Sequence, residues 1–432
     1  MRKYLVIFIV FIISIVFLSF TSTCLAQEKD IELLRRAAQT ELAGEEIAED
    51  KPEETIFKSG GLGLQALNPE ISVTGDFLTT FQNGEESEEN HHEEHGTGNC
   101  DFNFRGLGLH FESYLDPYSR FKAAVHAAPP PHGIEIEEGY FMRYGVLGGM
   151  TLTIGKFRQQ FGVVNRWHKH GLDQVDFPLA LRKIFGEHGL NQTGISLDWT
   201  MPQLGKSSQE LTLQFTNGEN SRMFEGNEKN VPSILAHYKN YLDLSKSTYF
   251  ELGLTYLIGW NDKWEVLEGT TPVHNHSTKP TSVIGLDLTL LWEPTDRMRY
   301  RNMVWRSELY CVNKKILAPD GTGKGRLNPW GAYTYIEQKV SRTLIIGIRG
   351  DYYQPDTKSY AEVNGLSLSP LAVTNKNAYL WQVGPYITWH QSPFVRFRLE
   401  YNHQDGKHMG TSQDIVILQC IFAAGPHKHE RY

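Results

Sequence analysis

The sequence predicts an all-β fold: a transmembrane antiparallel β-barrel of about 16 strands, with a short helical leader. Three observations support this. Apolar and polar residues alternate with a period of two in most segments after residue 70. The connections between these segments are alternately short and long. The chain is rich in aromatic residues, with 20 Tyr and 22 Phe, yet its mean hydropathy is −0.39, as expected of strands with one apolar and one polar face.

Residues 1–26 are predicted to be a signal peptide. Arg2 and Lys3 precede an apolar run at residues 5–20, and Cys24 and Ala26 occupy the small-residue positions of a cleavage site. A retained anchor helix is the weaker alternative, because the apolar run is short for a spanning helix. Lipid attachment at Cys24 is weaker still, because the preceding Thr-Ser-Thr lacks a leucine.

Residues 27–62 form an acidic leader that we expect in the periplasm. Residues 27–57 contain ten acidic and four basic residues, and spaced apolar residues predict a short helix within 28–50. Gly60, Gly61 and Gly63 then interrupt the chain. We assign residues 63–432 to the barrel.

The predicted strands have strict alternation over a length that suits a tilted strand crossing a bilayer. In 248–258, for example, Leu252, Leu254 and Tyr256 share one face, whereas Glu251 and Thr255 lie on the other. Sixteen segments follow this scheme: 70–81, 100–115, 118–127, 133–144, 149–158, 193–201, 209–217, 233–242, 248–259, 281–293, 297–312, 329–338, 342–352, 378–390, 393–403 and 412–423.

The connections predict which rim faces which compartment. Short turns on one rim and long loops on the other are typical of bacterial outer-membrane barrels. An even strand number then places the N- and C-termini together on the periplasmic side. A soluble β-sandwich or propeller is the alternative, but it would not sort its connections by length so regularly. Outward aromatic residues near strand ends fit interfacial girdles: Tyr256, Trp292, Tyr352, Trp389 and Tyr401.

Charge and cysteine content exclude other classes. Without the predicted signal peptide, the chain has 40 basic and 50 acidic residues, and the excess acidic residues are concentrated in 27–57 and 81–95. The rest of the chain is nearly balanced, so we expect no nucleic-acid partner. Three cysteines remain, an odd number and widely spaced, which excludes a disulfide framework or a cysteine zinc site as the organising principle and leaves a single disulfide between two of them open.

The longest predicted loop, residues 159–192, is a candidate for narrowing the lumen. A loop folded into a wide barrel would set ion selectivity through its charges; the alternative is a loop packed on the outer rim. The candidate constriction residues in this loop are Arg166, Asp173, Asp176, Arg182 and Glu187, and those on the lumen wall are Arg349, Arg396, Arg398 and Glu400. Bases and acids are mixed on the predicted wall, so no ion preference follows.

Histidine clusters suggest a metal-binding role. The runs 90–95, 168–170 and 274–276 place imidazoles beside one another in predicted loops, and imidazole with carboxylate suits zinc and similar divalent ions. The alternative is that these histidines are simply solvated. No cofactor is required, but Zn²⁺ or another divalent ion is an expected ligand of His91, His92, His95, His168, His170, His188, His274 and His276.

One stretch resembles a known family. The run GKFRQQFG at 155–162 resembles a strand-end motif of phosphate-selective porin O/P-type proteins. With DFPLAL at 176–181 and GEHGL at 186–190, it looks like a histidine-rich branch sometimes labelled zinc-regulated outer-membrane receptors. The resemblance implies a porin-like channel. TonB-driven uptake is disfavoured, because the chain is too short for a 22-stranded barrel with a plug.

These observations predict a cell outer-membrane channel for passive diffusion of small hydrophilic solutes, biased toward divalent metal ions such as zinc. A metal-capturing receptor with a closed lumen is the alternative. An outer-membrane enzyme is disfavoured, because we find no catalytic constellation. The expected partners are outer-membrane lipid, the transported solutes or metal ions, the barrel-assembly machinery and, by analogy, two further copies in a homotrimer.

Overall fold

The computed structural model divides the chain into two units, Met1–Ala66 and Leu67–Tyr432. It describes residues 70–83, 100–130, 133–224, 231–261, 264–268, 271–275, 278–317, 324–358, 362–363, 366–367, 371–408 and 412–425. The predicted signal peptide and acidic leader lie outside the described residues. No helix in the described ranges is long and apolar enough to cross a membrane.

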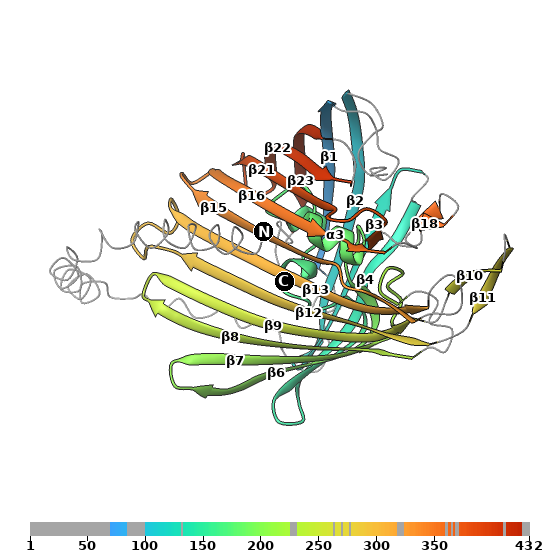
Figure 1. Ribbon diagram of the computed structural model, residues 1–432. Coiled ribbons are helices and arrows are strands. Elements are labelled where there is room, and N and C mark those ends of the chain that lie inside the picture. Colours follow the sequence, from blue (N-terminus) through green and yellow to red (C-terminus); the bar gives the residue numbers. More distant parts are fainter. Residues whose placement is uncertain are drawn as a thin grey trace, which may run out of the picture. The chain divides into compact units, whose positions relative to one another are not determined.

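The described part of the second unit is a closed antiparallel barrel of sixteen strands, as the alternation predicts (Figure 1). A short strand, β14 (Lys324–Leu327), pairs with the end of β13 and precedes β15. The barrel strands are β1 (Glu70–Asn83), β2 (Cys100–Asp116), β3 (Ser119–Ala128), β4 (Gly133–Val146), β5 (Met150–Arg158), β6 (Asn191–Leu204), β7 (Ser207–Thr216), β8 (Ser233–Ser245), β9 (Thr248–Asn261), β12 (Lys279–Trp292), β13 (Asn302–Leu317), β15 (Trp330–Lys339), β16 (Leu344–Gln354), β21 (Tyr379–His390), β22 (Val395–Lys407) and β23 (Gln413–Ala424).

Pairing between the first and last strands closes the barrel. β1 pairs with β2 along one edge and with β23 along the other, where Val73 faces Ala424 and Asn83 faces Asp414. Every backbone edge is thereby paired, which removes the exposed edge of an open sheet. Each remaining barrel strand pairs with its neighbours in chain order.

The two faces of each strand differ as the alternation predicts. On β22, Arg398 and Glu400 point into the lumen and are buried, whereas Leu399 and Tyr401 point outward and are exposed. Successive side chains of a strand lie on opposite faces, so this pattern gives the barrel a polar interior and an apolar exterior.

Most connections are sorted by length, as predicted, but residues 129–132 and 408–412 on the long-loop rim form shorter connections than residues 293–301 on the short-turn rim. Seven turns, such as the one between Asp116 and Ser119, lie at the short-turn rim. The long connections contain small hairpins and extended pairs in the described residues, formed by β10 (Trp264–Glu268) with β11 (Thr271–Asn275), β17 (Asp356–Thr357) with β20 (Ala372–Val373), and β18 (Glu362–Val363) with β19 (Leu366–Ser367).

One predicted boundary is wrong. The segment 297–312 was expected to be a strand throughout, but β13 begins at Asn302. Residues 294–301 instead form a turn, in which the amides of Tyr300 and Arg301 donate to the carbonyl of Arg297 at 2.9 Å. Met298 and Tyr300 alternate with arginines, so the turn mimics the strand pattern.

Candidate functional site: the inner loop and the cavity beside it

Residues 159–190, between β5 and β6, fold into the lumen. We call this segment the inner loop. It contains two short 3-10 turns, at Val164–Arg166 and Lys169–Gly171, and the helix α3 (Leu179–Phe185). Figure 1 shows α3 within the ring of strands. The loop therefore narrows the barrel from inside and does not pack on the outer rim.

Asn165 closes the neck of the inner loop. Its side-chain amide donates to the carbonyls of Gln159 at 2.8 Å and Leu190 at 3.0 Å, and its carbonyl oxygen accepts from the Leu190 amide at 2.8 Å. These bonds hold the two ends of the loop together beside the strands that it leaves and re-enters.

Glu308, on β13, anchors the start of the loop. Its carboxylate accepts hydrogen bonds from the amides of Val163 and Val164 at 2.9 and 3.0 Å, and from the hydroxyls of Tyr310 and Tyr333 at 2.6 Å each. Gly162 precedes these amides with a φ of +61°, and a Cβ there would lie 2.1 Å from the carboxylate. Glycine is thus required both by the backbone conformation and by the close approach of Glu308.

Four of the predicted lumen-wall residues hold the loop backbone. Arg396 donates to the carbonyl of His170 at 2.6 Å, and Arg398 to that of Leu172 at 2.9 Å. Glu400 accepts from the Val175 amide at 2.9 Å. Arg349 donates to the carbonyl of Asp176 at 2.9 Å and to Asp351 at 2.8 Å. Their side chains do face the lumen, but they are buried against the loop.

Two of the predicted loop charges, Asp173 and Asp176, bind the barrel wall. Asp173 accepts from the Tyr335 hydroxyl at 2.6 Å and pairs with Arg306 at 3.3 Å. Asp176 pairs with Arg105 at 3.2 Å.

The other three predicted loop charges bond within the loop. Arg166 donates to the side chain of Gln160 at 2.7 Å. Arg182 donates to the carbonyl of Phe177 and lies 3.6 Å from Glu187. These bonds join residues of the inner loop to one another.

An apolar cluster packs the loop against one side of the barrel. Phe161, Phe177 and Ile184 of the loop are buried with Tyr310 and Leu257 of the wall. Phe161 lies 4.9 Å from Phe185 and 5.6 Å from Tyr310, measured between ring centroids. Removal of these apolar side chains from water stabilises the packing of the loop against the wall. The loop therefore fills the side of the lumen next to Tyr310 and Leu257.

A β-bulge in β4 brings two carboxylates to one histidine. Ile136 pairs with Val125 and Glu138 with Ala124, so Glu137 is an extra residue in the strand. His168 bonds to Glu137 through Nδ1 and to Glu138 through Nε2, both at 2.9 Å. Burial favours the neutral ring, but the two carboxylates outweigh it and raise the pKa of His168 above its ordinary value. Since both ring nitrogens bond to carboxylate oxygens, both must donate, and we assign the ring as an imidazolium.

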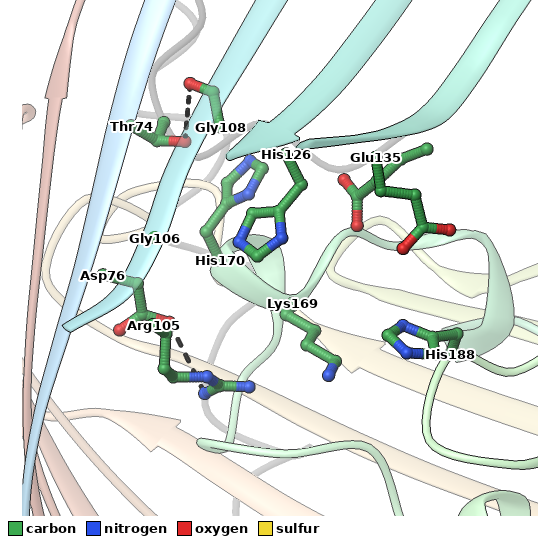
Figure 2. Close-up of a pocket in the computed structure, with 11 residues that line it drawn as sticks. Thr74, Asp76, Arg105, Gly106, Gly108, His126, Glu135, Lys169, His170 and His188 are labelled. Carbon is green, nitrogen blue, oxygen red and sulfur yellow. Dashed lines mark hydrogen bonds and ion pairs between the residues drawn. The ribbon is translucent and has the colours of Figure 1, made fainter. Parts of the chain in front are cut away.

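A small polar cavity of about 40 Å³ remains between the inner loop and strands β1–β4 (Figure 2). That volume has room for only a few water molecules. Lys169, His170 and His188 line it from the loop, and the wall contributes Thr74, Asp76, Arg105, Gly106, Gly108, His126, Glu135 and Glu137. We call it the constriction cavity.

Opposite charges are paired around the constriction cavity. Arg105 bridges Asp76 at 3.4 Å and Asp176 at 3.2 Å. Glu135, whose side chain is 52% exposed, lies 3.7 Å from the ammonium of Lys156. Among the carboxylates that line this cavity and form described ion pairs, Glu135 is therefore the most accessible.

The structure brings together part of the predicted metal-binding set. His170 and His188 share the constriction cavity, whereas His168 is bonded to its two carboxylates. His110 lies beside them, with its ring centroid 5.2 Å from His168 and 4.9 Å from His170. In the described part of the chain, no group of three His, Cys, Asp or Glu side chains is arranged to hold a metal ion. His91, His92, His95 and His276, and the side chain of His274, lie outside the described residues.

Sequence reasoning missed several residues that shape this site. Arg105, His110, His126, Glu138 and Glu308 lie on strands at lumen-facing positions. Alternation was the available signal for their direction. It does not show which residues of distant strands meet the loop.

Comparison with known proteins agrees with the barrel fold. No protein-family model matches the sequence. The chain is 25% identical over 393 residues to an uncharacterised protein of Aquifex aeolicus strain VF5, covering 84% of this chain and 80% of that protein.

Similar solved structures include the outer-membrane channel DcaP of Acinetobacter baumannii, with 12% identity, a TM-score of 0.53 and coverage of 83% of this chain and 97% of that one. An anion-selective porin from Comamonas acidovorans has 10% identity and a TM-score of 0.52, covering 83% and 99%. At these identities the likeness shows a porin-like barrel fold.

Proposed function

We propose that this chain is an outer-membrane channel for passive diffusion of small hydrophilic solutes. The observation that carries the proposal is a polar cavity beside an inner loop, within a wall whose outer surface is apolar. Leu254 and Leu399 on that surface are 53% and 49% exposed. Exposure of such an apolar surface to water is unfavourable, whereas its contact with lipid is favourable.

The proposed orientation follows from the connections. The short-turn rim would face the periplasm together with both termini, because strands that end in short turns face that side in bacterial barrels. The constriction cavity would then lie between the long loops and the periplasmic half of the lumen. Its small volume favours ions and small polar solutes.

Reconstitution in a planar bilayer tests the channel. We expect stepwise ion conductance, and silence over a range of salts and voltages would contradict the proposal.

Glu135→Lys should shift the reversal potential in a salt gradient toward anion preference, because it replaces the accessible carboxylate of the cavity. Glu219→Lys, at an exposed site in the connection after β7, is the matched control and should leave selectivity unchanged.

A bias toward divalent metal ions such as zinc is the finer part of the proposal. It is supported by His170 and His188 at the cavity with Glu135, and by the histidine-rich segments of the sequence. We expect zinc to reduce monovalent current in the wild-type protein, and less so in His170→Ala/His188→Ala. Alanine replacement of His91, His92 and His95, or of His274 and His276, tests the other predicted ligands. Equal zinc sensitivity in all variants would contradict the bias.

A metal-capturing receptor with a closed lumen is the second candidate. The observation that favours it is that the inner loop bonds to many sides of the barrel, from β4 to β22. Zinc binding without conductance would support it over the channel. The proposed relation to phosphate-selective porin O/P-type proteins rests on the motif at residues 155–162, and that to their histidine-rich branch on the longer stretch 155–195. A homotrimer inserted by the barrel-assembly machinery is proposed by analogy, and cross-linking in native membranes tests the homotrimer.

A further inference from the structure

Two neighbouring turns at the short-turn rim carry a concentration of positive charge. They are residues 293–301, between β12 and β13, and residues 339–343, which comprise Lys339 at the end of β15 and the connection to β16. Together they contain five bases and two acids, Glu293 and Asp296. We call this surface the arginine rim, and its bases are Arg297, Arg299, Arg301, Lys339 and Arg342.

The two turns are held side by side. β13 pairs with both β12 and β15, and Asn302 faces Lys339 in that pairing. The guanidinium of Arg342 lies 5.8 Å from the ring centroid of Tyr300, within range of a cation–π contact. The first turn also has its own backbone hydrogen bonds, including one from Arg297 to Pro294 at 3.0 Å.

Most of this positive charge is not neutralised locally. Arg297 lies 3.4 Å from Asp296, and both side chains are more than 60% exposed. Arg299, Arg301 and Lys339 form no ion pair with any carboxylate of the described residues. By contrast, Arg143, in β4 near the same rim, pairs with Asp116 at the end of β2 at 3.1 Å.

Exposed apolar side chains lie between these bases. Met298 is 51% exposed, Tyr300 48% and Val340 42%. They continue the outward apolar surface of the same strands, on which Ile346 and Ile348 are also exposed. Arginine and tyrosine beside an apolar surface are typical of the layer where lipid headgroups meet water.

We propose that the arginine rim binds the phosphate groups of anionic phospholipids in the leaflet that surrounds the short turns. This inference rests on the membrane placement of the proposed function. Guanidinium groups recognise phosphate oxygens through paired N–H donors. A dissolved phosphate ion offers the same chemistry, but only a lipid also accounts for the exposed Met298, Tyr300 and Val340.

A melting experiment in neutral detergent micelles tests the proposal. Adding phosphatidylglycerol should raise the melting temperature of the full barrel more than phosphatidylcholine does, because a ligand that binds the folded state stabilises it. Each exposed base near an anionic surface strengthens binding about fivefold. Arg299→Gln/Arg301→Gln should therefore weaken the apparent affinity for phosphatidylglycerol by about 25-fold.

Controls separate this site from general charge effects. Lys206→Gln/Lys246→Gln removes two bases from other short turns and should keep the wild-type shift, and Arg299→Lys/Arg301→Lys should recover most of the binding. Raising the salt should reduce the shift through screening. An unchanged shift in Arg299→Gln/Arg301→Gln, or an equal shift with inorganic phosphate, overturns the proposal.

Failure of this inference is distinguishable from failure of the proposed function. Conductance in bilayers of neutral lipid should be the same for wild type and for Arg299→Gln/Arg301→Gln, because the arginine rim lies away from the constriction cavity. Wild-type silence in those bilayers would count against the channel. A lipid-specific shift that the arginine variant abolishes would still support the rim.

Discussion

Glu308 shows how one side chain fixes the position of the inner loop. Its carboxylate joins two loop amides to two wall hydroxyls, so loop and wall share one buried acceptor. Removing one partner of such a network is costly, because a buried donor without an acceptor destabilises by roughly 1–3 kcal/mol.

We expect Glu308→Ala to release the start of the inner loop without unfolding the barrel. The two amides and two hydroxyls lose their acceptor, so the loop should become susceptible to protease and the single-channel conductance should rise. The measurement is limited proteolysis followed by conductance in a planar bilayer. Glu219→Ala, at an exposed site, is the control, and equal protection in both variants would refute the anchoring role.

His168 gives the loop a predicted pH dependence. Its pKa is raised in the folded protein, so the folded state binds the proton more tightly than an unfolded chain with a pKa of about 6.5. The stabilisation is complete below that unfolded value and is lost as pH rises through the higher folded value. Loop proteolysis should therefore increase on the alkaline side in the wild type. His168→Gln should remove this dependence, and a wild-type loop with constant protection across that window would contradict the assignment.

Individual lumen residues were only partly predictable. Alternation showed that Arg349, Arg396, Arg398 and Glu400 face inward, because a strand has only two faces. Their partners are loop carbonyls and amides more than 170 positions away. A period of two contains no information about contacts between segments so distant.

At the scale of elements, the barrel strands were predicted well because the strands of a closed barrel have few alternatives. Their period, length and turns all follow from one constraint, that the backbone must pair within a closed wall. The bulge in β4 was missed, because an extra residue looks like a break in alternation at Glu137 and Glu138. The inward fold of residues 159–190 depends on tertiary contacts, so the sequence left it open.

Deleting Glu137 should remove the bulge and leave β4 otherwise in register. Ile136 and Glu138 would then alternate regularly, and the strand should still pair with β3. His168 would keep one carboxylate in place of two, so the pH midpoint of loop protection should move lower. Glu137→Gln is the control for the change in the strand, because it removes the same carboxylate but keeps the bulge. Loss of the folded barrel, seen as loss of heat-modifiable gel mobility, would show that the bulge is required for closure.

At the scale of the whole molecule, the apolar exterior predicts how substitutions act with depth. Leu254 lies in the middle of β9 and Leu204 at the end of β6 on the short-turn rim. An arginine facing lipid at mid-depth costs roughly 2–4 kcal/mol, falling to about 0–1 kcal/mol near the interface. Leu254→Arg should therefore lose far more folding free energy than Leu204→Arg in urea titrations in lipid vesicles. Equal losses, or a chain that stays monodisperse in buffer without detergent, would exclude the membrane placement.

The neck of the inner loop has an evolutionary consequence. Arg158 and Asn191 face each other across adjacent strands, so everything between them is formally an insertion into an ordinary hairpin. Such an insertion can become longer or shorter, or its charges can change, while the number of strands and the stagger of the barrel stay the same. In the proposed channel, selection can thus change which solutes pass by editing one contiguous stretch of the gene, independently of the strands that form the wall.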